Sequence, residues 1–151
     1  MAHIKIPSVY DEKQVLVVDD EGEHVQFLID YLEGKGFRVT FVETAQDAIS
    51  ACESTKFRAY FIDLNIPFGA DSLPVDLKGV YQQYIGLYVI RAIRSQGNSG
   101  ARVLAYSAHY NDLIASEIER LYCKYVIKGR AKELKTAFDG VLEIDPVASK
   151  A

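Results

Sequence analysis

The chain has 151 residues, a net charge of −4 at pH 7 and 49% hydrophobic residues, which are the size and composition of one globular domain. The acidic balance, without any block of lysine or arginine, argues against binding to nucleic acid or to an anionic membrane surface. Because no apolar run approaches the roughly 20 residues of a membrane span, and the first residues lack the apolar core of a signal peptide, we expect a cytoplasmic protein.

The first half of the chain is predicted to contain three strands and two helices. Short apolar or alternating runs are typical of strands, and they occur at residues 14–18, 37–42 and 59–62. Apolar stripes with helical spacing occur at residues 21–35 and 45–52. Thr44 is the expected N-cap of the second helix, with Asp47 three residues later as a variant of the capping box.

The second half continues the same alternation. Helical stripes are predicted at residues 87–94, after Asn111 as a capping residue, and at 134–141. Strands are predicted at residues 102–106 and 124–127. Strand and helix therefore alternate five times, which predicts a doubly wound α/β fold with a parallel sheet. Ligands in such sheets bind at the carboxyl ends of the strands.

Carboxylates end two of these predicted core strands. Asp19 and Asp20 follow the first strand, and Asp63 follows the third. Taken alone, the Asp19–Asp20 pair is also typical of a helix N-terminus, where the dipole favours acids. Like charges gathered at one sheet edge repel each other and favour a bound cation. Oxygen ligands without nearby histidine or cysteine indicate Mg²⁺ rather than zinc.

Two further predicted strands end in polar groups, Ser107 and Lys128. Asp63 is able to ligate a metal ion with one oxygen and to act as a nucleophile with the other. Lys128 and Ser107 supply a cation and a hydroxyl donor for phosphoryl oxygens. Together with a metal ion, this set of groups fits phosphoryl transfer to an aspartate.

Four fragments resemble, in the same order, the receiver domains of bacterial two-component response regulators. They are VVDDE (17–21), IDLNIP (62–67), YSA (106–108) and YVIKG (125–129). The resemblance covers nearly the whole chain and implies a flavodoxin-like (βα)5 fold with a five-stranded parallel sheet in the order 2-1-3-4-5. It also implies a signalling phosphoprotein that takes a phosphoryl group from a histidine kinase or a histidine phosphotransfer protein. Such a domain catalyses its own phosphorylation and slow dephosphorylation and is not an ordinary turnover enzyme.

The resemblance assigns roles to individual residues. Asp63 matches the phospho-acceptor, and Lys128 matches the lysine that acts with it. Asp19, Asp20 and Asp63, together with the backbone carbonyl of Asn65, match the Mg²⁺ ligands.

The remaining matched residues concern switching. Ser107 matches the catalytic and switch hydroxyl, and Tyr125 matches the aromatic switch that turns inward. Asn65 and His109 fall where the family tunes the lifetime of the phosphate. Without the resemblance, Tyr125 reads as a packing residue and His109 as an exposed loop residue. The implied output face consists of the family's fourth helix, fifth strand and fifth helix, which binds a downstream protein or a second copy and contacts neither nucleic acid nor membrane.

The sequence departs from the family pattern at two places. Gly129 stands where the family usually has a proline, often with a cis bond, and glycine is free to adopt positive φ there. Gly86, which matches the glycine of the family's third helix, lies 19 positions after Pro67, where the family needs only a few. Residues 68–85 therefore read as an insertion. They form either an extended third helix with its own small core or a lid or docking surface near Asp63.

These observations give a domain organisation and rank the functions. Residues 1–13 are an N-terminal extension, 14–144 a receiver domain and 145–151 a tail, and the chain is either a stand-alone regulator or part of a longer one. One alternative is an adaptor that acts through the insertion without phosphorylation. Another is a phosphohydrolase that forms an aspartyl phosphate, but haloacid-dehalogenase-like enzymes usually have a second aspartate where Asn65 stands.

Overall fold

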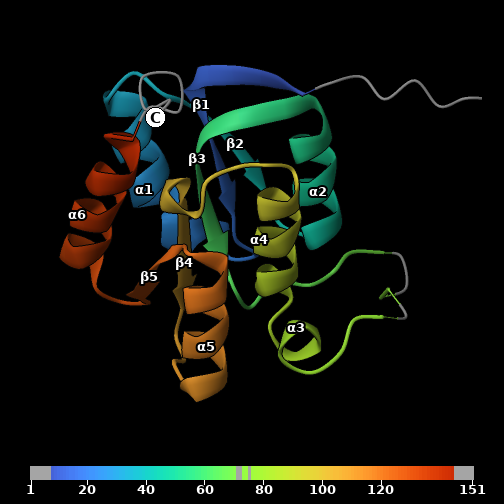
Figure 1. The fold of residues 1–151 in the computed structure, drawn as a ribbon. Coiled ribbons are helices and arrows are strands. Elements are labelled where there is room, and N and C mark those ends of the chain that lie inside the picture. The colour runs from blue at the N-terminus through green and yellow to red at the C-terminus, as the bar shows by residue number, and fades with distance from the viewer. Residues whose placement is uncertain (1–7, 71–72, 75, 145–151) are drawn as a thin grey trace, which may run out of the picture.

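A five-stranded parallel sheet with helices on both faces forms the centre of the computed structural model (Figure 1). The structure describes residues 8–70, 73–74 and 76–144. The strand order is β2-β1-β3-β4-β5, which confirms the predicted doubly wound, flavodoxin-like topology. In the described part of the chain, no helix has the length and apolar character needed to cross a membrane.

The strands are β1 (Val9–Val18), β2 (Arg38–Val42), β3 (Thr55–Asp63), β4 (Val103–Ser107) and β5 (Lys124–Ile127). The helices are α1 (Gly22–Gly34), α2 (Ala45–Ser54), α3 (Val80–Gln83), α4 (Ile85–Ser95), α5 (Asp112–Leu121) and α6 (Ala131–Leu142), with a 3-10 turn at Gly100–Arg102. Because α3 is an additional short helix, the third, fourth and fifth helices of the prediction correspond to α4, α5 and α6.

The first strand is longer than its apolar run predicts. β1 begins at Val9, and residues 9–11 pair in parallel with residues 55–57 of β3. The register shifts between Asp11 and Val15, so this polar stretch joins the sheet through an irregularity. An ion pair of 2.6 Å between the Arg38 guanidinium and Asp11 supports the extra length. Hydrophobic periodicity does not detect such polar backbone pairing.

Two predicted helix caps are confirmed. The Thr44 hydroxyl accepts a hydrogen bond of 3.1 Å from the Asp47 amide at the start of α2. The Asn111 side-chain oxygen accepts one of 2.9 Å from the Ile114 amide at the start of α5. Each cap satisfies a backbone donor that the first helical turn leaves unpaired.

Two hydrophobic cores lie on opposite faces of the sheet. The α1 and α6 side contains residues such as Leu28 and Phe138, and the α2, α4 and α5 side contains residues such as Leu87. Neighbouring residues of the central strand β3 serve both, because Phe61 faces the first core and Ile62 the second. The core thereby fixes β3 from both sides and holds Asp63 at its carboxyl end.

The segment between β3 and α4 does not extend the following helix. α3 is a separate helix of four residues, and Tyr84 leaves the helical region with φ −125° before α4 begins at Ile85. Backbone bonds connect the beginning of the segment to α2, since the Ala45 and Gln46 amides donate to the carbonyls of Pro67 and Phe68. Whether residues 68–85 are an insertion relative to receiver domains stays a prediction. The tail 145–151 and the first seven residues lie outside the described part of the chain.

Candidate functional site

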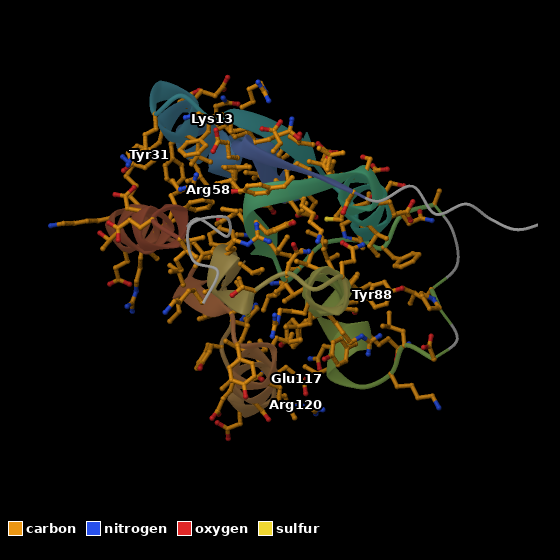
Figure 2. The ribbon with its side chains drawn as sticks, turned by 45° about the horizontal axis from the view of Figure 1, so that its top comes forward. Lys13, Tyr31, Arg58, Tyr88, Glu117 and Arg120 are labelled. Atoms are coloured by element: carbon orange, nitrogen blue, oxygen red, sulfur yellow. The ribbon has the colours of Figure 1, made fainter. Side chains whose placement is uncertain are left out.

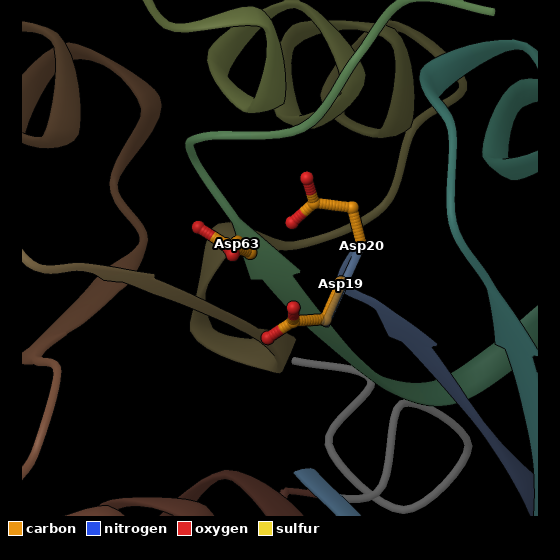
Figure 3. A group of neighbouring side chains, drawn as sticks. All are labelled: Asp19, Asp20 and Asp63. Atoms are coloured by element: carbon orange, nitrogen blue, oxygen red, sulfur yellow. The ribbon is translucent and has the colours of Figure 1, made fainter. Parts of the chain in front are cut away.

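Three carboxylates converge at the carboxyl ends of β1 and β3 (Figure 3). Asp19, Asp20 and Asp63 each offer an oxygen atom, and these atoms lie within 4.8 Å of one another. Asp19 and Asp63 are completely buried, whereas Asp20 is exposed. The parallel pairing of β1 with β3 brings the two strand ends together, as the sequence predicts.

Both oxygens of Asp63 have a partner. Oδ1 accepts a hydrogen bond of 2.9 Å from the backbone amide of Asn65, and Oδ2 lies 2.9 Å from the ammonium of Lys128. The first turn of α4 packs against the backbone that follows Asp63, because the Gly86 amide donates a hydrogen bond of 3.1 Å to the Leu64 carbonyl. A Cβ on Gly86 would lie 2.3 Å from the carbonyl oxygen of Asp63, so only glycine fits there.

Asp19 has an unsatisfied oxygen. Its Oδ1 accepts a hydrogen bond of 2.7 Å from the Glu21 amide, but the buried Oδ2 has no hydrogen-bond partner among the described residues. Burial, together with the charge of Asp63, raises the pKa of Asp19 to about 6. Burial and the charge of Asp63 also raise the pKa of Asp20. The protein therefore leaves excess negative charge and a free oxygen at one place.

These groups fit a divalent cation. An oxygen-only donor set of three carboxylates, one of them with an unsatisfied buried oxygen, matches the preference of Mg²⁺ for hard oxygen ligands. Asp19, Asp20 and Asp63 are the side chains that would hold it. The participation of the Asn65 carbonyl stays a prediction.

Lys128 lies between the acidic cluster and an aromatic ring. Burial alone would lower the pKa of Lys128, but the hydrogen bond and charge of Asp63 outweigh it and raise this pKa. The ammonium also lies 4.9 Å from the ring centroid of Tyr106. The Lys128 amide donates to the Ser107 carbonyl at 2.9 Å, which connects β5 to the end of β4.

The Ser107 hydroxyl is buried and already accepts two hydrogen bonds. The donors are the Asn65 side-chain amide at 3.2 Å and the His109 backbone amide at 3.1 Å. With both acceptor positions occupied, its own hydrogen is the group left to donate. Ser107 is thus tied to the loop after Asp63 and to the loop after β4.

Comparison with known proteins places this geometry in a fold. No protein-family model matches the sequence, and no curated protein matches it either. Among solved structures, the signal receiver domain of a putative LuxO repressor protein from Vibrio parahaemolyticus is 22% identical, with a TM-score of 0.67 over 87% of this chain and 90% of that one. The chain has the fold of response-regulator receiver domains.

Two further solved structures with the receiver fold bear on the site. The receiver domain of a sensor histidine kinase from Pseudomonas aeruginosa, solved with magnesium ion coordinated in its active-site cleft, is 20% identical, with a TM-score of 0.60 over 85% of this chain and 97% of that one. A response regulator protein from Burkholderia pseudomallei, solved with a phosphorylated aspartic acid and a calcium ion, is 21% identical, with a TM-score of 0.63 over 91% of this chain and 73% of that one.

Tyr125 on β5 is half-buried beside Ser107, and its role as an aromatic switch stays a prediction. Its hydroxyl donates to the His109 carbonyl at 2.9 Å and lies 3.3 Å from the Ser107 carbonyl. Its ring lies 4.7 Å from that of Tyr110, which is exposed. The His109 side chain is exposed, so the contacts of this residue with Ser107 and Tyr125 come from its backbone.

Gly129 gives the loop after Lys128 its own conformation. Its φ is +92°, as expected for a glycine in place of the usual receiver proline, and no cis peptide bond occurs in the described part of the chain. A cavity of about 410 Å³ opens beside it. The cavity is lined by Phe27, Tyr106, Ile127, Lys128, Gly129, Arg130 and Leu134.

Two residues that lie at this site were not predicted from the sequence. Tyr106 supplies the ring next to Lys128, and Tyr84 hydrogen-bonds to Asn111 in the loop after Ser107. Tyr106 stands in the YSA fragment, directly before Ser107, so its position in the sequence was a usable signal. No sequence signal pairs Tyr84 with Asn111, because they lie 27 positions apart and meet only through the packing of α4 and α5.

Proposed function

We propose that this chain is a two-component receiver domain that accepts a phosphoryl group from a phosphohistidine onto Asp63, with Mg²⁺. The observation that carries the proposal is the environment of Asp63. This buried carboxylate stands at the end of the central strand, 2.9 Å from Lys128, within a cluster of three acids. A receiver-fold neighbour that contains a phosphorylated aspartic acid supports it.

The chemistry is an in-line transfer between two nucleophiles. An oxygen of Asp63 attacks the phosphorus atom, and the bond between phosphorus and the imidazole nitrogen breaks. The electron pair of that bond returns to the nitrogen, and the phosphoryl group remains as an acyl phosphate on Asp63. The protein contributes mainly position and electrostatics, as in other phosphoryl transfers.

The donors around Asp63 stabilise the charge of the transferred group. The ammonium of Lys128 is placed to shift from Oδ2 of Asp63 to a phosphoryl oxygen, and the free hydrogen of Ser107 is available to a second oxygen. When bound, Mg²⁺ neutralises phosphoryl and carboxylate oxygens together. Asp19 and Asp20 keep the cation beside the reacting carboxylate, and a receiver-fold neighbour with magnesium in its cleft supports this choice of metal.

Switching follows from the contacts of Ser107. A turn of its hydroxyl towards the phosphoryl group breaks the bonds from Asn65 and His109 and displaces the loop on which Tyr125 rests. The face formed by α5, β5 and α6 is then presented differently to a downstream protein or a second copy. The phosphodonor is a histidine kinase or a phosphotransfer protein, which places this receiver in the cytoplasm. Asn65 and His109 are the positions at which the lifetime of the phosphate is set.

Incubation with acetyl phosphate and Mg²⁺ tests the proposal. We expect a mass increase of one phosphoryl group, sensitive to hydroxylamine, that disappears when Mg²⁺ is chelated. Asp63→Asn should abolish the increase, and Asp112→Asn, an exposed acid on α5, should leave it intact. A wild-type protein that is not modified, or an Asp63→Asn variant that still is, contradicts the proposal. Unchanged binding of a partner by Asp63→Asn would favour an adaptor acting through residues 68–85.

A further inference from the structure

The segment of residues 79–85, which we call the strap, is attached to α5 by two tyrosines. The Tyr81 hydroxyl donates a hydrogen bond of 2.5 Å to Oε2 of Glu117. The Arg120 guanidinium donates one of 3.2 Å to Oε1 of the same carboxylate. Beneath Tyr81, the guanidinium of Arg91 lies 4.3 Å from the ring centroid, so α4 supports the ring from the other side. Figure 2 shows Glu117 and Arg120 on α5 and Tyr88 on the neighbouring α4.

The second attachment involves the residue that caps α5. The buried Tyr84 accepts a hydrogen bond of 3.1 Å from the side-chain nitrogen of Asn111. The side-chain oxygen of Asn111 accepts from the Ile114 amide at 2.9 Å. One amide side chain therefore holds the strap and the first turn of α5 at the same time.

The residue directly after the strap, Gly86, touches the phospho-acceptor side of the site. Two residues after Tyr84, the Gly86 amide donates to the Leu64 carbonyl at 3.1 Å. The backbone is so close that a Cβ on Gly86 would lie 2.5 Å from the Cα of Leu64. The end of the strap is therefore held by Tyr84 on Asn111, in the loop after Ser107, and lies two positions before the contact of Gly86 with Leu64, the residue after Asp63. These are the two places that a phosphoryl group would act on.

We propose that phosphorylation of Asp63 releases the Tyr84 end of the strap from the cap of α5, so that this end of residues 79–85 reports the state of the site to a partner. The proposal rests on the proposed function and adds a second output element to it. A turn of Ser107 towards the phosphoryl group moves the loop through His109 to Asn111, and a hydrogen bond of 3.1 Å tolerates little displacement. Without that bond, the strap is still attached through Tyr81 and Glu117, but the end of α3 next to Tyr84 loses its support, and one helical turn is unstable on its own.

Hydrogen exchange of the strap measures its release directly. The amides of Gln82 and Gln83 donate to the Gly79 carbonyl, and the amide of Tyr84 donates to the Val80 carbonyl at 2.8 Å. These amides are protected while the strap is held and exchange when it opens. Exchange is read by mass spectrometry on the whole chain with Mg²⁺, with and without acetyl phosphate, in samples whose phosphorylation is measured by intact mass.

Tyr84→Phe removes one hydroxyl and keeps the ring. We expect it to increase exchange in residues 82–84 about fivefold without acetyl phosphate, the effect of losing one hydrogen bond. The matched control is Tyr88→Phe, because the Tyr88 hydroxyl makes no hydrogen bond with other described residues and its ring contacts Phe68 and Arg91. Phosphorylation should raise exchange in the wild type and in Tyr88→Phe, and should add little in Tyr84→Phe.

The outcomes separate the two proposals. No phosphorylation of the wild type overturns the proposed function and the release of the strap with it. Full phosphorylation with unchanged exchange at residues 82–84 overturns only the release. Equal exchange in unphosphorylated Tyr84→Phe and Tyr88→Phe also overturns it, because the Tyr84–Asn111 bond would then not hold the strap. Thermal unfolding of each variant shows whether a change in exchange is local or reflects lower global stability.

Discussion

The ammonium of Lys128 lies 2.9 Å from Oδ2 of Asp63, and this ion pair joins the carboxyl ends of β5 and β3 across β4. The Asp63 side chain is 0% exposed and that of Lys128 is 19% exposed, so water screens the pair weakly. We therefore expect the Lys128 ammonium to affect both the stability of the folded protein and the reactivity of Asp63.

Lys128→Met should slow phosphorylation by acetyl phosphate about 100-fold, because one preorganised charge next to the phosphoryl oxygens is lost. It should also lower the free energy of unfolding without Mg²⁺ by about 3 kcal/mol, since Asp63 loses its buried partner. Intact-mass time courses and urea unfolding measure the two effects. Lys124→Met on the same strand is the control, because that side chain is exposed. Equal phosphorylation rates in the two variants would contradict a role for Lys128.

Asp20→Asn should make the metal-free protein more stable and less responsive to Mg²⁺. The substitution removes one of three neighbouring carboxylates, so it relieves repulsion and takes away a ligand. In the wild type, Mg²⁺ should raise the midpoint of thermal unfolding in a concentration-dependent way. The variant should start from a higher midpoint and shift less. A shift with Mg²⁺ as large as that of the wild type would show that Asp20 is not a ligand.

Ser107→Ala should separate phosphorylation from switching. Asp63 and Lys128 remain, so an aspartyl phosphate should still form, while the hydroxyl that links the site to His109 is missing. Hydrogen exchange of residues 108–111 and 124–127 should then change on phosphorylation in the wild type but not in the variant. Ser116→Ala on α5 is a suitable control because that side chain is exposed. If hydrogen exchange in Ser107→Ala changes on phosphorylation as it does in the wild type, the hydroxyl has no role in switching.

The pH dependence of stability should include a contribution from Asp139 on α6. The Lys35 ammonium, 2.8 Å away, and the Tyr31 hydroxyl lower the pKa of Asp139 below its ordinary 3.8, although partial burial opposes them. A carboxylate with a lowered pKa stabilises the fold above its unfolded-state pKa, and the stabilisation is lost as the pH falls through the lowered value.

Asp139→Asn should therefore lower the free energy of unfolding by about 0.5 kcal/mol at pH 7. The effect is small because the side chains of Lys35 and Asp139 are both about 40% exposed. The difference from the wild type should narrow as the pH falls below about 4. Urea midpoints across this range measure it, with Asp76→Asn, an exposed acid outside any helix, as the control. A difference in unfolding free energy that grows as the pH falls would contradict the stabilising role of the ionised Asp139.

Alanine at three glycines should give three different results. Gly86→Ala should lower the free energy of unfolding by about 3 kcal/mol, because the new Cβ would lie 2.3 Å from the Asp63 carbonyl oxygen. Gly129→Ala should cost about 1–2 kcal/mol from its φ of +92° alone, since nothing lies within 4 Å. Gly34→Ala, in a helix with open space around it, should be neutral or stabilising. Urea unfolding tests the order, and an equal loss at Gly86 and Gly129 would contradict it.

The features that the sequence predicted well are those decided by local physics. The caps at Thr44 and Asn111 and the strand at residues 124–127 follow from side-chain chemistry and hydrophobic period within a few positions. The convergence of the carboxylates followed from one further rule, that parallel strands end at the same edge of a sheet.

The features that it did not predict depend on contacts between distant segments. The polar start of β1 belongs to the sheet only because β3 pairs with it. The separate helix α3 is flanked by contacts of the same kind, because Tyr81 and Tyr84 hydrogen-bond to Glu117 of α5 and to its cap Asn111, and neither partner is near in sequence. The sequence favoured an extended third helix over a lid or docking surface for this segment, and its residue spacing did not decide between them.

The arrangement around Asp63 also has a consequence for charge balance. With a divalent cation in place, three carboxylates, one lysine and the metal ion add up to no net charge. Under the proposed function, a phosphoryl group on Asp63 would raise the negative charge there, so the site would become anionic without any new cation. The hydrogen-bonding groups at this place among the described residues include the Ser107 hydroxyl and the backbone amides of Asn65 and His109, all of them neutral. Movement of these neutral donors towards the added charge would then couple the proposed modification to the loops that carry them.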